Sequence, residues 1–280
     1  MDIAELQDYY DKKVRKRIIK APFMNVIRLA RLCMFQFTED HRRLKKLRGK
    51  YEGQRCFIVG NGPSLTIEDL EKIKGEHCFG FNRIYETFDK TAWRPEFYMV
   101  LDNDVMCNVA KNLEKVEAKI KLLNIMAKAK GVKRDDNTIF FCSFGLYRVK
   151  EYAYKKKRIS TDISRYFSLN FSVACGAIEA AIYMGFKKIV LIGFDNNFSR
   201  YVDENGKIHT QDIADYSLMS MPDYIQYSHV DASNSCFAAY RTYAESNGIE
   251  ILNATRGGKL EVFERVDFDE LMAKTNLEEN

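Results

Sequence analysis

Residues 55–64 read Arg-Cys-Phe-Ile-Val-Gly-Asn-Gly-Pro-Ser, and this stretch decides the fold. A short apolar strand, 56–59, leads directly into a turn that contains Gly60 and Gly62, and a helix is expected to follow. Such junctions hold phosphate groups in α/β proteins, because glycine lets the backbone approach the ligand and the first amides of the helix favour negative charge. The third glycine of the dinucleotide motif and the Lys-Ser/Thr of a P-loop are both missing. The junction is therefore a candidate nucleotide site of another kind, with a plain tight turn as the alternative.

Short apolar strands alternate with helices along the rest of the chain. The expected strands are 56–59, 77–81, 97–101, 138–142, 188–192 and 249–252. The expected helices are 67–74, 104–120, 172–184 and 233–247. Thr66 and Asp69 form a capping signal at the start of the first helix, and Gly185 is a typical C-terminal stop. We predict an α/β fold with a Rossmann-like, mostly parallel sheet, helices on both faces and an N-terminal helical extension.

The composition suits one large domain with an accessory segment. The chain has 280 residues, 46% of them hydrophobic and 30% charged, and only 4 prolines. We divide it into a basic amphipathic extension, residues 1–50, and an α/β domain, residues 51–280. The long irregular stretch 196–231, which has three tyrosines within 216–227, is expected to form a lid.

Positive charge is concentrated in the N-terminal fifth. Residues 1–50 carry 14 Lys and Arg against 6 Asp and Glu, a net of +8, whereas the whole chain is +5. Basic runs at 12–20 and 42–48 flank a mostly apolar helix, 24–37. Residues 12–48 are therefore expected to contact the inner membrane surface or a second subunit of a homo-oligomer, with packing on their own domain as the alternative. Nucleic acid is not an expected partner, because the remainder is acidic and has no recognition module.

Cysteine usage and the N-terminus indicate a cytoplasmic protein. The seven cysteines are an odd number and form no C-x-x-C pair, which favours a reducing compartment and no zinc site. Residues 1–5 have no signal-peptide character, and no apolar stretch reaches the ~18 residues of a membrane span. We expect a peripheral protein at the inner face of the cytoplasmic membrane.

Polar side chains follow four of the expected strands, namely Asn61, Asn82, Asp102 and Asp195. The carboxyl ends of parallel strands share one edge of the sheet, and ligands bind there. Four such residues together favour a binding site over four unrelated turns. Arg83, Arg94 and Arg256 are candidates for neutralising phosphate or for surface ion pairs.

Several blocks resemble known bacterial families. Residues 57–65, Phe81-Asn82 and 185–195 resemble the lipooligosaccharide sialyltransferases. A closer resemblance is to a broader bacterial group that shares a domain with flagellin-modifying glycosyltransferases and the archaeal hydroxymethylpterin pyrophosphokinase. Its members carry blocks like Gly-Phe-Asn-Arg-Ile-Tyr (80–85), Trp-Arg-Pro (93–95) and Asn-Ala-Thr-Arg-Gly-Gly-Lys-Leu-Glu-Val-Phe (253–263). The resemblance covers residues 55–266.

The resemblance implies roles for particular residues. It assigns a nucleotide, which in the sialyltransferases belongs to a cytidine-monophosphate sugar, to Gly60, Asn61, Gly62, Pro63, Ser64 and Asn82. Ser172 falls near the loop-to-helix nucleotide contact of those enzymes, and Asp195 and Arg83 complete the expected donor-binding set. Their general base is a His before the last helix, which corresponds to His229; His209 is the reserve candidate.

Two departures set the chain apart from the sialyltransferases. Those enzymes steady the departing phosphate with two tyrosines, whereas only Tyr201, with Arg200 beside it, could serve here. Asp102 replaces their Asn, so the donor can differ from a cytidine-linked sialic acid. Asp102 and Asp104 could hold Mg²⁺ or Mn²⁺ as an Asp-x-Asp pair. Alternatively, Asp104 could cap the helix 104–120 while Asp102 touches ribose or the acceptor. The resemblance favours a reaction that requires no metal or other cofactor.

The sequence therefore predicts a glycosyltransferase. It would move a sugar, of the sialic-acid type or another kind, from a CMP-linked or other nucleotide-linked donor to a hydroxyl of a bacterial surface glycan or glycolipid. Lipopolysaccharide or capsule synthesis is the expected setting, and His229, Tyr201 and Asp102 are the expected catalytic residues. The alternative is a Mg²⁺-dependent pyrophosphokinase that uses ATP and a hydroxymethylpterin-like substrate.

Overall fold

The computed structural model of the chain describes residues 2–144, 159–168, 172–220 and 227–278. Six residues of the expected lid, 221–226, therefore fall outside the described residues.

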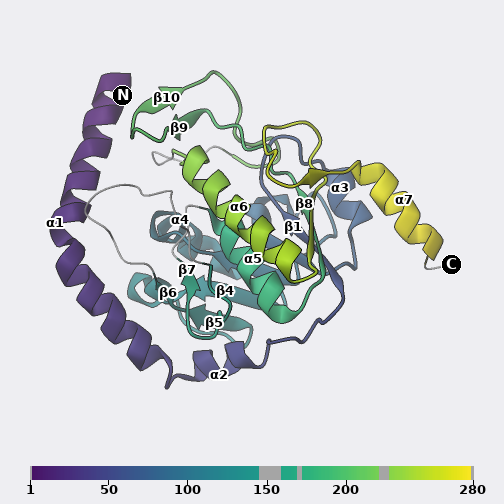
Figure 1. Ribbon diagram of the computed structural model, residues 1–280, viewed down its shortest axis with the longest axis horizontal. Coiled ribbons are helices and arrows are strands. Elements are labelled where there is room, and N and C mark those ends of the chain that lie inside the picture. The colour runs from purple at the N-terminus through teal and green to yellow at the C-terminus, as the bar shows by residue number, and fades with distance from the viewer. Residues whose placement is uncertain (1, 145–158, 169–171, 221–226, 279–280) are drawn as a thin grey trace.

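An eight-stranded parallel sheet forms the centre of the molecule (Figure 1). Its strand order is β12-β11-β8-β1-β2-β3-β4-β5, and every neighbouring pair is parallel. The strands are β1 (Arg55–Val59), β2 (Cys78–Phe81), β3 (Phe97–Val100), β4 (Ile120–Asn124), β5 (Thr138–Phe141), β8 (Lys188–Ile192), β11 (Glu250–Asn253) and β12 (Glu264–Arg265). The predicted mostly parallel α/β fold is confirmed.

Each face of the sheet buries its own hydrophobic core. Alternate β1 residues, Cys56 and Ile58 against Phe57 and Val59, belong to two separate clusters, as the two-residue period of a strand requires. The first cluster includes residues of α2, α5 and α6, and the second includes residues of α3, α4 and α7. The helices that pack on the sheet are α2 (Glu39–Lys45), α3 (Ile67–Lys72), α4 (Asn103–Val109), α5 (Val173–Met184), α6 (Val230–Ser246) and α7 (Phe268–Glu278). Three 3-10 helices connect strands, η1 (Ile84–Thr87), η2 (Ala110–Lys115) and η3 (Ile125–Lys130).

A long N-terminal helix, α1 (Ile3–Phe35), stands along one side of the molecule (Figure 1). Its last residue, Phe35, is buried in the first core cluster. Its first turns contact a small antiparallel hairpin, β9 (Arg200–Val202) and β10 (Ile208–Thr210). A further two-stranded pair, β6 (Ser143–Phe144) and β7 (Phe167–Ser168), lies beside the main sheet. Helix α1 is therefore attached at both ends. In the described part of the chain, no helix combines the length and the apolarity needed to span a bilayer.

Several element boundaries differ from the sequence prediction. Strand β4 was not expected, because its Lys121 interrupts the apolar run; the structure buries this side chain and pairs it with Asp135 at 3.0 Å. The helix expected over 104–120 consequently ends as α4 and η2. The N-terminal helix begins at Ile3 rather than at residue 24, and the stretch 196–231, expected to be irregular, contains β9 and β10. The Thr66–Asp69 capping box and the left-handed Gly185 stop are confirmed.

Candidate functional site

The site is built where the strand order reverses. After β1 the chain proceeds to β2 on one side, and after β8 it proceeds to β11 on the other, so the two loops diverge from neighbouring strands. Ligands of doubly wound sheets bind in the crevice at such a switch point. The predicted Gly-Asn-Gly-Pro-Ser turn, residues 60–64, is one of these two loops, and residues 193–199 are the other.

Glycines allow the two loops to touch at their backbones. The amide of Gly60 donates to Ile192 O at 2.7 Å, and the amide of Gly62 donates to Gly193 O at 2.9 Å. A Cβ atom on Gly60 would lie 2.2 Å from Gly193 O, and one on Gly62 would lie 1.9 Å from Asp195 Oδ2. Gly193 itself has a left-handed φ of 69°. The two glycines of the Gly-Asn-Gly-Pro-Ser turn are therefore needed for the close packing of the two loops.

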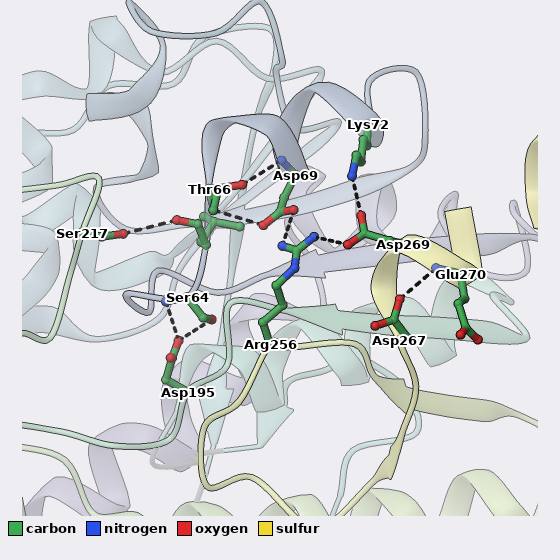
Figure 2. A network of polar contacts seen from close by, with 11 residues as sticks. Ser64, Thr66, Asp69, Lys72, Asp195, Ser217, Arg256, Asp267, Asp269 and Glu270 are labelled. Atoms are coloured by element: carbon green, nitrogen blue, oxygen red, sulfur yellow. Dashed lines mark hydrogen bonds and ion pairs between the residues drawn. The ribbon is translucent and has the colours of Figure 1, made fainter. Parts of the chain in front are cut away.

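Asp195 braces the first loop from the second (Figure 2). Its Oδ2 atom accepts hydrogen bonds from the hydroxyl of Ser64 at 2.8 Å and from the Ser64 amide at 3.3 Å. These contacts hold the start of the turn that leads to α3. In this arrangement Asp195 positions the Gly-Asn-Gly-Pro-Ser turn, whereas the sequence analysis assigned Asp195 to the donor-binding set itself.

Asn61 and Asn82 lie at the carboxyl ends of β1 and β2, which are adjacent strands. Asn61 Nδ2 donates to Phe81 O at 3.3 Å, and its Oδ1 is buried with no hydrogen-bond partner among the described residues. Asn82 has a left-handed conformation, with a φ of 51°. Its amide donates a hydrogen bond to Met99 O, and its carbonyl accepts one from the Tyr98 hydroxyl. Burial raises the pKa of Tyr98, so this hydroxyl stays a donor. A buried amide oxygen without a donor costs free energy, which a ligand N–H or O–H would recover.

Asp102 and Asp104 follow β3, the next strand, and both are engaged. Asp102 Oδ1 caps α4 by accepting from the amides of Asp104 at 2.6 Å and Val105 at 3.2 Å. Asp104 Oδ2 forms an ion pair with Lys13 of α1 at 2.9 Å. The helix cap expected for Asp104 is therefore supplied by Asp102. Each carboxylate thus already has partners in the chain, and the described residues contain no group of three or more His, Cys, Asp or Glu side chains that could hold a metal ion.

His229 and Tyr201 are brought together beside the N-terminal helix. Tyr201 pairs with Ser228, whose carbonyl accepts from the Val202 amide at 2.8 Å, so residues 227–229 extend the β9–β10 hairpin. The His229 ring lies 6.0 Å from the Tyr10 ring of α1 and 5.9 Å from that of Tyr227. The predicted base thus lies under α1 and directly before α6.

Segment 212–220 extends over the rim of the sheet. The Ser217 hydroxyl donates to Leu65 O at 3.2 Å, directly after the Gly-Asn-Gly-Pro-Ser turn (Figure 2). Arg83 donates to the Ser220 hydroxyl at 3.0 Å and lies 5.4 Å from the Tyr216 ring. Arg83 thus holds this segment, which the sequence analysis expected to be part of a lid.

The remaining sequence candidates have other partners. Arg256 pairs with Asp69 of α3 and, at 2.9 Å, with Asp269 of α7 (Figure 2). Arg94 donates to carbonyls of its own turn and pairs with Glu117 at 3.2 Å.

His209 pairs with Asp203 at 2.9 Å, which lowers the pKa of that carboxyl, and its ring stacks on Tyr201. Ser172 caps α5 at the same edge of the sheet by accepting from the Ala174 amide at 3.3 Å.

Three residues that sequence reasoning missed belong to this region. Lys13 links Asp104 with Tyr227, whose ring centroid lies 5.9 Å from its ammonium group. Tyr10 covers His229. The Oδ1 atom of Asn197, in the loop after β8, is buried and has no hydrogen-bond partner in the described part of the chain. An Asn-Asn pair after a buried strand was a signal for Asn197, whereas contacts of α1 depend on tertiary structure alone.

The fold and these loops define a Rossmann-like α/β protein with a polar loop cluster at the switch point of its sheet. The 6-hydroxymethylpterin diphosphokinase MptE-like family model matches residues 34–200, and the chain belongs to this family. The family relationship inferred from the sequence motifs is confirmed.

Solved structures of two transferases are similar to the chain. The MAf glycosyltransferase of Magnetospirillum magneticum AMB-1 is 15% identical with a TM-score of 0.44; the match covers 86% of this chain and 41% of that one. The chain thus spans about two fifths of that protein's length. The sialyltransferase CstII of Campylobacter jejuni, in complex with cytidine-5'-monophosphate, is 15% identical with a TM-score of 0.40 over 77% of this chain and 85% of that one. No curated protein matched the chain.

Proposed function

We propose that this protein is a glycosyltransferase that binds a nucleotide sugar across the carboxyl ends of β1, β2 and β3. The observation that carries the proposal is the buried Oδ1 of Asn61, which has no hydrogen-bond partner in the described part of the chain, beside the left-handed Asn82. Both lie at the sheet edge where a doubly wound protein binds its ligand. The nucleotide would supply the missing donor, and the lid segment 212–220 would exclude water from the activated sugar.

His229 is the proposed general base. It would take the proton of an acceptor hydroxyl while the hydroxyl oxygen bonds to the anomeric carbon of the sugar. The bond from that carbon to the phosphate oxygen would break, and the nucleotide would leave with the electron pair. Tyr201, adjacent to His229 through Ser228, would donate a hydrogen bond to the departing phosphate. We expect the acceptor to be a hydroxyl of a surface glycan or glycolipid.

The matched variants His229→Ala and His209→Ala test this assignment. His229→Ala should lower turnover by about 10²–10⁴-fold, the usual size of a general-base effect, while donor binding survives. His209→Ala should have a much smaller effect, because His209 is held by Asp203 in the hairpin. Unchanged turnover in His229→Ala would remove this residue from the role. A large loss in His209→Ala alone would transfer the role to His209.

The second candidate is a pyrophosphokinase, which the family match favours. A hydroxymethyl oxygen of a pterin-like substrate would attack the β-phosphorus of ATP, and AMP would leave. This reaction needs Mg²⁺, so Lys13 would have to release Asp104 for the cation. Titration of the protein with CMP, UDP and ATP, with Mg²⁺ or with EDTA, separates the candidates: tight binding of ATP only with Mg²⁺ supports the kinase, and metal-independent CMP or UDP binding supports the glycosyltransferase.

A further inference from the structure

The N-terminal segment carries a group of exposed large hydrophobic side chains. In the described part of the chain, all of them lie between residues 3 and 37; they are Ile3, Tyr9, Ile18, Ile19, Phe23, Val26, Leu29, Met34 and Phe37. Four exceed 70% exposure, namely Ile19, Phe23, Met34 and Phe37. Scattered exposed apolar residues are ordinary, but a set gathered on one element indicates an interaction surface.

These residues form one continuous outer face on α1. From Pro22 to Phe37, every residue that the structure leaves exposed is apolar; we call these residues the outer face, and they are Pro22, Phe23, Val26, Leu29, Ala30, Cys33, Met34 and Phe37. Their spacing of three and four keeps them on one side of a helix. At about 1.5 Å per residue, the helical part of this face is about 18 Å long. The opposite side of α1 carries Ala21 and Phe35, which are buried.

Exposed basic side chains lie at both ends of the outer face. Before it come Lys12, Arg15, Lys16 and Lys20, and after it come Arg42, Lys45, Lys46 and Arg48. The two acidic residues between these groups, Glu39 and the buried Asp40, both pair with Arg134, at 3.2 Å and 2.6 Å. An apolar strip with cations at each end matches the apolar interior and anionic headgroups of a bilayer.

We propose that the outer face of α1 docks on an anionic lipid bilayer surface. The charges decide against a second copy of the chain as occupant. In a parallel pair each basic end would face itself, and in an antiparallel pair residues 12–20 would face residues 42–48, so both pairings place like charges together. A bilayer of anionic lipids neutralises both ends at once.

Docking would also orient the candidate site. The opposite side of α1 holds the β9–β10 hairpin: Gln7 Nε2 donates to Gly206 O at 3.0 Å, and the Ile208 amide donates to Gln7 Oε1 at 2.9 Å. Tyr10 packs on Tyr227 and His229. The helix that would rest on the lipid is thus the one that covers the proposed base, which places this side of the molecule next to the bilayer.

Vesicle cosedimentation of the full chain tests the proposal. Wild type should pellet with vesicles of phosphatidylcholine and one third phosphatidylglycerol, and should stay in solution with phosphatidylcholine alone. The double variant Phe23→Glu/Val26→Glu should weaken binding by about tenfold or more, because it places two charges on the apolar strip. The control Ala238→Glu/Thr242→Glu adds the same charge to exposed positions of α6 and should bind like wild type. Melting temperatures verify that both variants are folded.

A second measurement does not depend on any variant. Cys33 is the exposed cysteine of the chain, so an environment-sensitive dye attached there should shift to the blue when anionic vesicles are added. Three results overturn the proposal: wild type remains in solution with anionic vesicles, the dye does not shift, or Phe23→Glu/Val26→Glu binds as well as wild type. Light scattering that shows a stable dimer of wild type, lost in this variant, would overturn it in favour of a second copy.

Discussion

At the scale of single residues, Gly60 is confined by the backbone of the neighbouring loop. Its backbone φ is not left-handed, so its requirement is steric: a Cβ would lie 2.2 Å from Gly193 O, in a backbone that cannot move without parting β1 from β8. Gly176 in α5 is different, because the nearest atom to its Cβ is the flexible Met99 sulfur at 3.2 Å.

We therefore expect two matched glycine substitutions to lower the free energy of unfolding by very different amounts. Gly60→Ala should lower the free energy of unfolding by about 3 kcal/mol, the upper end of the usual cost of overpacking. Gly176→Ala should cost much less, because alanine also improves the propensity of the α5 helix. Urea denaturation of both variants measures the difference, and similar losses in the two would contradict the contact between the two loops.

The positions of several site residues could be predicted from the sequence, but their contacts could not. Asn61, Asn82 and Asp102 were expected at one sheet edge because polar residues followed separate apolar strands, and β1, β2 and β3 are indeed neighbours. The hydrogen-bond and ion-pair partners of the site residues could not be predicted from the sequence. The contact between Asp195 and Ser64 depends on loop conformations. The ion pair between Asp104 and Lys13, 91 positions apart, depends on a helix outside the motif-bearing region.

At the scale of elements, α5 is fastened by a buried carboxylate. Glu179 accepts from the Ser160 amide at 2.7 Å, the Ser168 amide at 2.9 Å and the Tyr240 hydroxyl at 2.9 Å. One side chain thereby joins α5 to α6 and to the segment around β7. Burial raises the pKa of Glu179 above its ordinary value of 4.5, while these hydrogen bonds oppose the rise.

The raised pKa gives a signed prediction for pH dependence. A group with a raised folded pKa contributes stability that is full below about pH 4.5 and is lost as the pH rises through the folded pKa. Glu179→Gln should remove this loss and flatten the pH profile of stability just above pH 4.5. Near neutral pH the variant should still be less stable by about 1–3 kcal/mol, since its amide NH₂ must face a backbone N–H donor, that of Ser160 or that of Ser168, whichever way it is turned. Chemical denaturation between pH 4 and 8 measures both effects, and an unchanged pH slope would contradict this account.

The elements that were mispredicted have physical explanations. Strand β4 carries Lys121, whose charge is balanced by Asp135 from outside the strand, so alternation of apolar residues could not show it. Strand β12 has only two residues, too few for any periodic pattern. The buried strands β1 and β8 were predicted closely, because continuous apolar runs bounded by glycine are typical of central parallel strands.

At the scale of the whole molecule, α1 joins the hairpin to the α/β domain. Leu6 and Tyr10 form a small core with Val202 and Ile208, separate from the two large clusters of the sheet. A cluster of this size opens more readily than the central sheet. The hairpin that carries Tyr201 is therefore held by α1 to a large extent.

Hydrogen exchange should reveal this dependence. Tyr10→Ala should speed the exchange of amides in β9 and β10 and at residues 227–233, while amides of β1 and β8 keep their protection. Tyr9→Ala is the matched control, since Tyr9 is exposed on the same helical turn and should leave the hairpin unchanged. Equal protection of the hairpin in Tyr10→Ala and wild type would show that α1 does not stabilise it.

Pro22 divides α1 between its two attachments. Proline has no amide hydrogen, so the carbonyl one turn earlier loses its partner, and the helix is weakest against bending at this point. The stretch before Pro22 grips the hairpin and the stretch after it ends in the main core. Helix α1 can therefore bend at Pro22. A tilt of its second half would then be taken up at this proline and need not displace His229, which lies beneath its first half.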